Sequence, residues 1–181
     1  MLREFMILSR GGQGGVTASR ILATAAALEG KWAQAIPEFG AERRGAVVRS
    51  YVRVSDEPIR RRSAVKEPEG VAVFSSRILE LTDVNKFAPP PTPLLINSEK
   101  GAVLGERRVF YVDATGIALK LGLIVAGWPL VNTAMAAAMA RTFDIAGLES
   151  VKKAMGDYLR GKTLEANLAA AELAWESVRG L

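Results

Sequence analysis

Apolar residues recur along the chain in two spacings, which predict strands alternating with helices. The run from Phe5 to Leu8 predicts a buried strand over residues 1–8. Residues 16–29 have the spacing of a helix, which Gly30 closes in the usual position just past the end. The apolar positions of this helix are Ala18, Ile21, Leu22, Ala25 and Leu28. A short extended stretch follows at 32–36.

Four further stretches predict strands. Residues 47–54 alternate with a period of two, so one face packs while the other, partly polar face has Arg49 and Arg53. Continuous apolar runs at 71–74, 94–97 and 109–112 predict buried strands, and 78–87 reads as a short amphipathic segment. The last strand ends at Asp113, which is either a binding group of the kind found at strand ends or a turn-forming aspartate.

The last third of the chain has helical spacing. Residues 128–133 are expected to open a helix that is nearly all alanine, and later apolar stripes begin at Leu148 and Leu164. The pair Asn132-Thr133 either caps its helix or contacts a ligand or subunit. Together the elements predict an α/β fold: a single layered domain over residues 1–181 with a Rossmann-like β-sheet flanked by helices and a helical C-terminal third.

Composition narrows the possible functions. The chain has 181 residues, 49% of them hydrophobic, enough to bury a core. It has neither a bilayer-length apolar run nor a secretory leader, so we expect a soluble, cytoplasmic protein without a membrane partner. It also has no cysteine and no histidine, which excludes thiolate-held iron–sulfur clusters and histidine-based nucleophile systems within this chain. We therefore expect a protein that acts by binding, with no catalytic residue and no metal of its own.

A glycine turn lies between the first strand and the first helix. Exposed backbone N–H groups at such a helix start attract anions, and glycine lets a ligand approach the backbone. The turn is neither the dinucleotide fingerprint, which needs glycine at Thr17, nor a triphosphate loop, which needs Lys-Ser or Lys-Thr. The alternative is a tight turn that binds nothing. The candidate anion-binding residues are Gly11, Gly12, Gln13, Gly14, Gly15 and Thr17.

The chain has a net charge of +5, and two groups of arginines lie close together in the sequence. Glu42, Arg43, Arg44 and Gly45 form a loop whose two guanidinium groups suit phosphate or carboxylate, although an internally salt-bridged loop is the alternative. The presence of the glycine turn favours a joint anion site. Residues 60–62 are three consecutive arginines, which we interpret as a solvated loop with an anion contact as the alternative.

Four ordered segments resemble the gamma subunit of the 2-oxoacid:ferredoxin oxidoreductases, in particular the pyruvate and 2-ketoisovalerate branch. These segments are residues 10–18, 39–46, 53–59 and 132–135, and Asn167 also fits. The resemblance covers essentially the whole chain. Ser9 and Ala41 depart from the family pattern, which usually has glycine and proline at these positions.

The resemblance implies a non-catalytic subunit of a thiamine diphosphate enzyme of the pyruvate synthase class. The enzyme oxidatively decarboxylates a 2-oxoacid, transfers the acyl group to coenzyme A and reduces ferredoxin. Alpha, beta and delta subunits are implied as partners that hold thiamine diphosphate, magnesium and iron–sulfur clusters. The gamma part is implied to cap the active site and to be associated with coenzyme A. We therefore expect the glycine turn and the Glu42–Gly45 run to contribute to a shared coenzyme A site or to the subunit junction.

The sequence disfavours two other functional classes. A stand-alone nucleotide-binding α/β protein is disfavoured because the G-x-G-x-x-G frame is missing. A nucleic-acid-binding module is disfavoured because no aromatic residues are interleaved with the basic run at 60–62.

Overall fold

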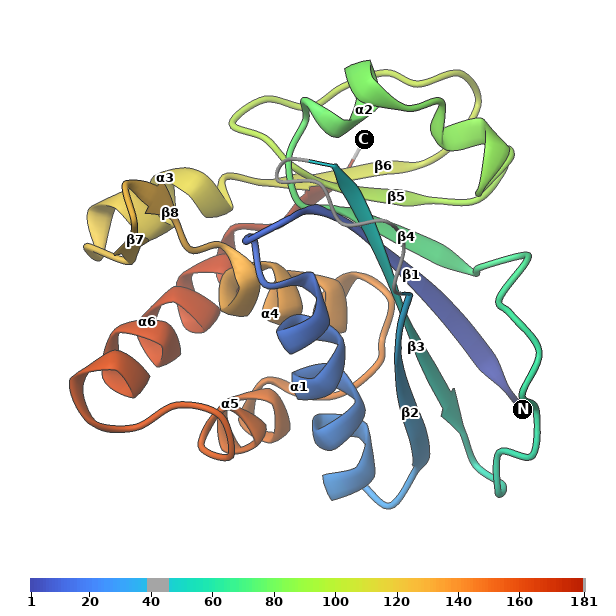
Figure 1. Ribbon diagram of the computed structural model, residues 1–181, viewed down its shortest axis with the longest axis horizontal. Coiled ribbons are helices and arrows are strands. Elements are labelled where there is room, and N and C mark those ends of the chain that lie inside the picture. The colour runs from blue at the N-terminus through green and yellow to red at the C-terminus, as the bar shows by residue number, and fades with distance from the viewer. Residues whose placement is uncertain (39–45, 181) are drawn as a thin grey trace.

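A computed structural model describes residues 1–38 and 46–180. In these ranges seven strands form one sheet in the order β2-β3-β1-β4-β5-β6-β9, and β7 pairs with β8 in a separate hairpin (Figure 1). The strands are β1 Arg3–Arg10, β2 Trp32–Pro37, β3 Val47–Ser55, β4 Gly70–Val73, β5 Leu94–Asn97, β6 Val109–Val112, β7 Ile124–Val125, β8 Trp128–Pro129 and β9 Arg179–Gly180.

The centre of the sheet is parallel and its two sides are antiparallel. Strands β1, β4, β5 and β6 run in one direction, with Phe5 opposite Gly70 and Leu95 opposite Phe110. Strands β3 and β2 extend the sheet antiparallel beyond β1, and β9 pairs antiparallel with β6. All four parallel strands therefore end at the same edge, where α/β sheets place their ligands.

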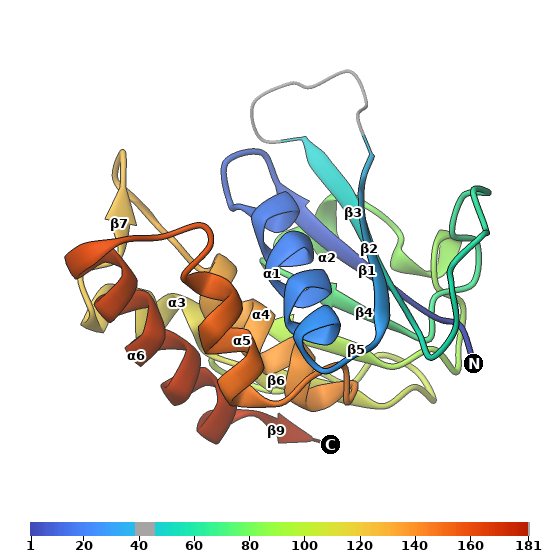
Figure 2. The same ribbon diagram turned by 90° about the horizontal axis from the view of Figure 1, so that it is seen from below.

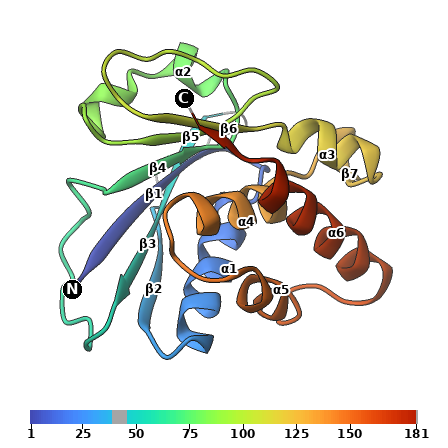
Figure 3. The same cartoon turned by 180° about the vertical axis from the view of Figure 1, so that it is seen from behind.

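The longer helices cover one face of the sheet. The helices are α1 Gly15–Leu28, α2 Ile78–Leu81, α3 Ala114–Lys120, α4 Asn132–Thr142, α5 Leu148–Met155 and α6 Gly161–Ser177, with a 3₁₀ turn at Val84–Lys86. Helices α1, α4, α5 and α6 lie together on one side, and α2 lies on the other (Figures 1 and 3). Among the described residues no helix is long and apolar enough to cross a bilayer.

Two apolar cores follow from the alternation of side chains along the strands. Phe5 and Ile7 point to the helical face, and Met6 and Leu8 point to the opposite face, which α2 and neighbouring loops cover. Helix α4 is buried from Asn132 to Ala140 because its small side chains let α1 and α6 approach closely. A helix that is apolar on every side is stable only when it is surrounded in this way.

The sequence-based expectation of a layered α/β fold is confirmed. The closure of the first helix at Gly30 is also correct: Gly30 has a φ of 80°, and the Gly30 and Lys31 N–H groups donate to the carbonyls of Ala27 and Ala26. This is the pairing of a Schellman motif.

The expectation that residues 128–133 open a helix is wrong for the residues before Asn132. Trp128 and Pro129 form β8, and α4 begins only at Asn132. These two residues pair with β7, and a hydrogen bond from Leu130 N–H to the Leu123 carbonyl (2.8 Å) extends the hairpin beyond them. The helical spacing therefore begins after the hairpin.

Candidate functional site

The glycine turn lies at the edge of the sheet where the parallel strands end. Gly12 and Gly14 have φ angles of 91° and 76°, and Gly14 is the N-cap of α1 with no side-chain cap hydrogen bond. Gln13 secures the turn, because its Oε1 accepts from Arg10 N–H (2.8 Å) and its Nε2 donates to the Phe74 carbonyl beyond β4 (3.4 Å). Gln13 thus links the turn to the neighbouring strand.

Two of the four glycines are required by packing. A Cβ on Gly14 would lie 2.7 Å from Asn132 Nδ2 and 2.9 Å from Asn132 Cβ at the start of α4. A Cβ on Gly15, which is buried, would meet the side chain of Ser9 at the end of β1. These contacts set the distance between α1, β1 and α4.

The other two glycines face solvent. Gly11 and Gly12 are exposed, and a Cβ on Gly12 would meet nothing within 4 Å. The Gly11 N–H donates to the Ala46 carbonyl (3.3 Å), so the turn touches the chain just before β3. Thr17 is half-buried in the first turn of α1, where helical N–H groups have no partner within the helix. A ligand that reaches this edge meets backbone rather than side chains at Gly11 and Gly12.

The second predicted group, Glu42, Arg43, Arg44 and Gly45, lies outside the described residues. The last described residue before that group is Glu38, whose carboxylate accepts from Tyr51 Oη (2.6 Å) and from Arg49. Burial, with the neighbouring Glu38 as a second cause, raises the pKa of Tyr51 to about 12. The Arg49 guanidinium also lies 4.8 Å from the centre of the Phe87 ring.

Asn132, Thr133 and Asn167 form a polar group between α4 and α6. Thr133 Oγ1 donates to Asn167 Oδ1 (2.6 Å), and Asn167 Nδ2 donates to the Thr163 carbonyl (2.8 Å). Val131, rather than Asn132, is the N-cap residue of α4, and Asn132 Oδ1 accepts from Thr133 N–H (2.9 Å). Asn132 also packs against Gly14. The three residues of this polar group, all of which match the family pattern, therefore lie together beside the glycine turn.

Thr133→Val is expected to lower the free energy of unfolding by about 1–3 kcal/mol, because it leaves the buried Asn167 Oδ1 without a donor. Urea denaturation of the purified chain measures the change. Thr133→Ser is the matched control, since it keeps the hydroxyl and loses one methyl group, at about 1 kcal/mol. Equal losses for the two variants would contradict a contribution of the hydrogen bond.

Asn97 and Thr115 are further residues at this edge that the sequence did not single out. Asn97 Nδ2 donates to the Phe74 carbonyl and to Thr115 Oγ1 (both 2.9 Å), and Thr115 N–H donates to Asn97 Oδ1 (3.2 Å). They connect the ends of β4 and β5 to α3. The available signal was an asparagine directly at the end of an apolar strand.

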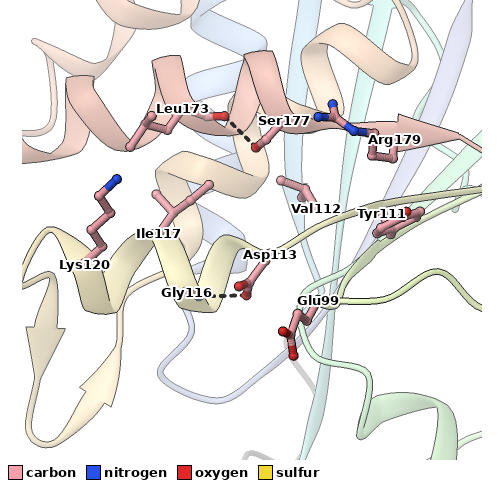
Figure 4. A pocket seen from close by; sticks show the side chains of 10 residues that line it. All are labelled: Glu99, Tyr111, Val112, Asp113, Gly116, Ile117, Lys120, Leu173, Ser177 and Arg179. Atoms are coloured by element: carbon pink, nitrogen blue, oxygen red, sulfur yellow. Dashed lines mark hydrogen bonds between the residues drawn. The ribbon is translucent and has the colours of Figure 1, made fainter.

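Asp113 serves as the N-cap of α3. Its Oδ1 accepts from Gly116 N–H (2.8 Å), as Figure 4 shows, so the turn-forming interpretation describes it. It borders a cavity of about 460 Å³ between β6, α3 and the end of α6. Acidic and basic side chains both line this cavity: Glu99, Asp113, Lys120 and Arg179.

The arginines at 60–62 are exposed, as expected for a solvated loop. Arg61 Nη1 pairs with Glu4 Oε2 (3.0 Å). In the described part of the chain, no three His, Cys, Asp or Glu side chains gather to form a possible metal site.

Comparison with known proteins gives consistent matches over nearly the full chain. The pyruvate ferredoxin/flavodoxin oxidoreductase family profile matches residues 4–177. Pyruvate synthase subunit PorC of Methanocaldococcus jannaschii is 42% identical over 97% of this chain and 96% of its own. The pyruvate/ketoisovalerate oxidoreductases common subunit gamma of Pyrococcus furiosus is 40% identical over 96% and 95%. The crystal structure of pyruvate oxidoreductase subunit PORC from Thermotoga maritima has a TM-score of 0.83 at 31% identity, over 99% of this chain and 98% of that one.

Proposed function

The chain belongs to the pyruvate ferredoxin/flavodoxin oxidoreductase family as a gamma-type subunit, and on that premise we propose that it caps the active site and shares a coenzyme A site with a partner subunit. The assembled enzyme oxidatively decarboxylates a 2-oxoacid to an acyl-CoA and reduces ferredoxin. Alpha, beta and delta subunits hold thiamine diphosphate, magnesium and the iron–sulfur clusters. The absence of cysteine from this chain supports placing the clusters in the partners.

The observation that carries the proposal is the exposure of Gly11 and Gly12 at the carboxyl edge of the parallel strands. Coenzyme A carries several phosphate groups, and phosphate binds well where backbone N–H groups at a helix start are accessible. Gly14 and Gly15 contribute by packing, which fixes the turn against Ser9 and Asn132. The accessible part of the turn is thus held on a rigid base.

The hydrogen bond from Gly11 N–H to the Ala46 carbonyl supports a joint site. It places Ala46, which follows Gly45 directly in the sequence, beside Gly11. A guanidinium group binds phosphate oxygens through paired, charge-assisted hydrogen bonds. The net charge of +5 also favours a polyanionic ligand over a neutral one.

Replacing Arg43 or Arg44 with alanine in the assembled enzyme is expected to raise the Michaelis constant for coenzyme A. Loss of one charged hydrogen bond costs roughly 1–3 kcal/mol, equivalent to about 5- to 150-fold. Steady-state kinetics at saturating 2-oxoacid and electron acceptor measure the change. The Michaelis constant for the 2-oxoacid should stay within about twofold, since that substrate binds in the partner's thiamine site.

Arg60→Ala is the matched control, because Arg60 is exposed in the separate basic run. It should leave the Michaelis constant for coenzyme A unchanged. If the Arg43 and Arg44 variants assemble fully and bind coenzyme A as the unmodified enzyme does, these arginines are not part of the site.

A further inference from the structure

The hairpin formed by β7 and β8 projects from the body of the chain. Val125 pairs with Trp128 and Ile124 with Pro129, and the tip stands away from the helices (Figure 2). Its two turn residues, Ala126 and Gly127, have φ angles of 50° and 81°. Two consecutive left-handed residues form the turn that best fits the twist of a two-residue hairpin.

The outward side chains of this hairpin are apolar. Ile124, Val125 and Trp128 are 49%, 59% and 69% exposed. Val125 and Trp128 are direct cross-strand neighbours, so their side chains share one face. A two-stranded ribbon is marginally stable in water by itself, and exposed apolar side chains grouped together usually mark a binding surface.

A pocket of about 340 Å³ lies directly behind the hairpin. Apolar side chains form most of its wall, and the amides of Asn132 and Asn167 also line it. The only ionisable side chain among its described lining residues is Lys162 in the first turn of α6, for which no ion pair with a described residue is seen. We name this pocket together with Ile124, Val125 and Trp128 the hairpin surface.

We propose that the hairpin surface is the docking site for another subunit of the oxidoreductase, one that presents apolar side chains and a carboxylate opposite Lys162. The inference rests on the proposed function, because it requires that the chain works inside a larger enzyme. Trp128 anchors the contact from this side, as buried tryptophan does at many interfaces, while an apolar side chain of the partner fills the pocket. The carboxylate gives Lys162 the counter-charge that it lacks within the described chain.

Two features favour this occupant. Asn132 both lines the pocket and packs against Gly14, so a single buried residue separates the pocket from the glycine turn, where a partner is proposed to complete the coenzyme A site. A second copy of this chain is disfavoured as occupant because each copy has a net charge of +5 and offers the same lysine. Like charges brought together oppose association.

The test uses the complete oxidoreductase, purified with Trp128→Ser or with the unmodified chain. Trp128→Ser is expected to weaken binding of this chain to the iron–sulfur-containing subunits at least tenfold, measured by sedimentation over a dilution series with the cluster absorbance as the signal. Trp32→Ser is the matched control, because Trp32 is 53% exposed on the outer strand β2, away from the hairpin. It should leave the affinity unchanged. Lys162→Glu should also weaken assembly, and the deficit should shrink as salt is raised.

Three results separate the possibilities. Equal affinities for the unmodified and Trp128→Ser chains overturn the docking proposal. So does a variant that assembles normally while the self-association of the isolated chain is lost, because the surface then belongs to a second copy. If even the unmodified chain does not bind iron–sulfur-containing subunits, the proposed function itself fails. Unchanged circular dichroism of Trp128→Ser confirms that the exposed substitution leaves the fold intact.

Discussion

Arg53→Ala is expected to lower the free energy of unfolding by about 3–5 kcal/mol, a large part of the stability of an ordinary domain. The Arg53 side chain is 1% exposed, and its Nε donates to Glu4 Oε1 at 2.7 Å. Its remaining nitrogens donate to the backbone carbonyls of Arg61 (3.0 Å) and Ser63. Truncation leaves a largely buried carboxylate and two carbonyls without this donor. Urea denaturation monitored by circular dichroism measures the loss.

Arg49→Ala is the matched control, four residues earlier on the same face of β3. Arg49 is 34% exposed, and its ion pair with Glu38 should contribute about 1 kcal/mol or less. Adding Glu4→Gln to Arg53→Met should recover about 1 kcal/mol or more relative to Arg53→Met alone, since no buried charge is then left without its partner. Arg61 also loses Glu4 in this variant, but its side chain is 54% exposed and stays solvated. Similar losses for the Arg49 and Arg53 variants would contradict the assigned role of burial.

Gly14→Ala is expected to cost about 2–5 kcal/mol. Its φ of 76° is left-handed, which costs a non-glycine residue roughly 1–2 kcal/mol. The new Cβ would also lie within 3 Å of Asn132 Nδ2 and Cβ, and overpacking of this kind costs about 1–3 kcal/mol. Because Asn132 begins the buried helix α4, it has little freedom to move away. Thermal or urea denaturation of the purified chain gives the value.

Gly12→Ala separates the two contributions. Gly12 also has a left-handed φ, 91°, but a Cβ there would have open space, so only the conformational cost of roughly 1–2 kcal/mol should appear. The difference between the two variants reports the contact with Asn132. If Gly12→Ala destabilises the chain as much as Gly14→Ala, the steric contribution is absent.

The glycine turn illustrates how far a local pattern reaches. Its position between a strand and a helix follows from the sequence, because the change from a continuous apolar run to helical spacing marks the boundary. The different roles of its glycines do not follow. Glycine is required at positions 14 and 15 because a Cβ there would meet the side chains of Asn132 and Ser9. The contact with Asn132 joins positions that are 118 residues apart in the sequence (132 minus 14). Anion binding at Gly11 and Gly12 stays a prediction.

The β7–β8 hairpin is the clearest failure of the sequence-based interpretation. Ala126-Gly127 is not the Asn-Gly or Asp-Gly pair that usually marks such a turn, and each strand has only two residues. Two residues are too few to display a period. The same limit explains why β9, also two residues long, was not predicted within the helical C-terminal third.

The sequence by itself determined the order of the main strands and helices, the closure of α1 at Gly30 and the layered α/β class, because these depend on periodicity and backbone preference over neighbouring residues. Family membership was also readable, since its motifs lie in order along the chain. Only the tertiary structure decided that Arg53 is buried, that Thr133 meets Asn167 and that Trp128 faces solvent. Each depends on which distant element covers the residue, and a local pattern has no information about that partner.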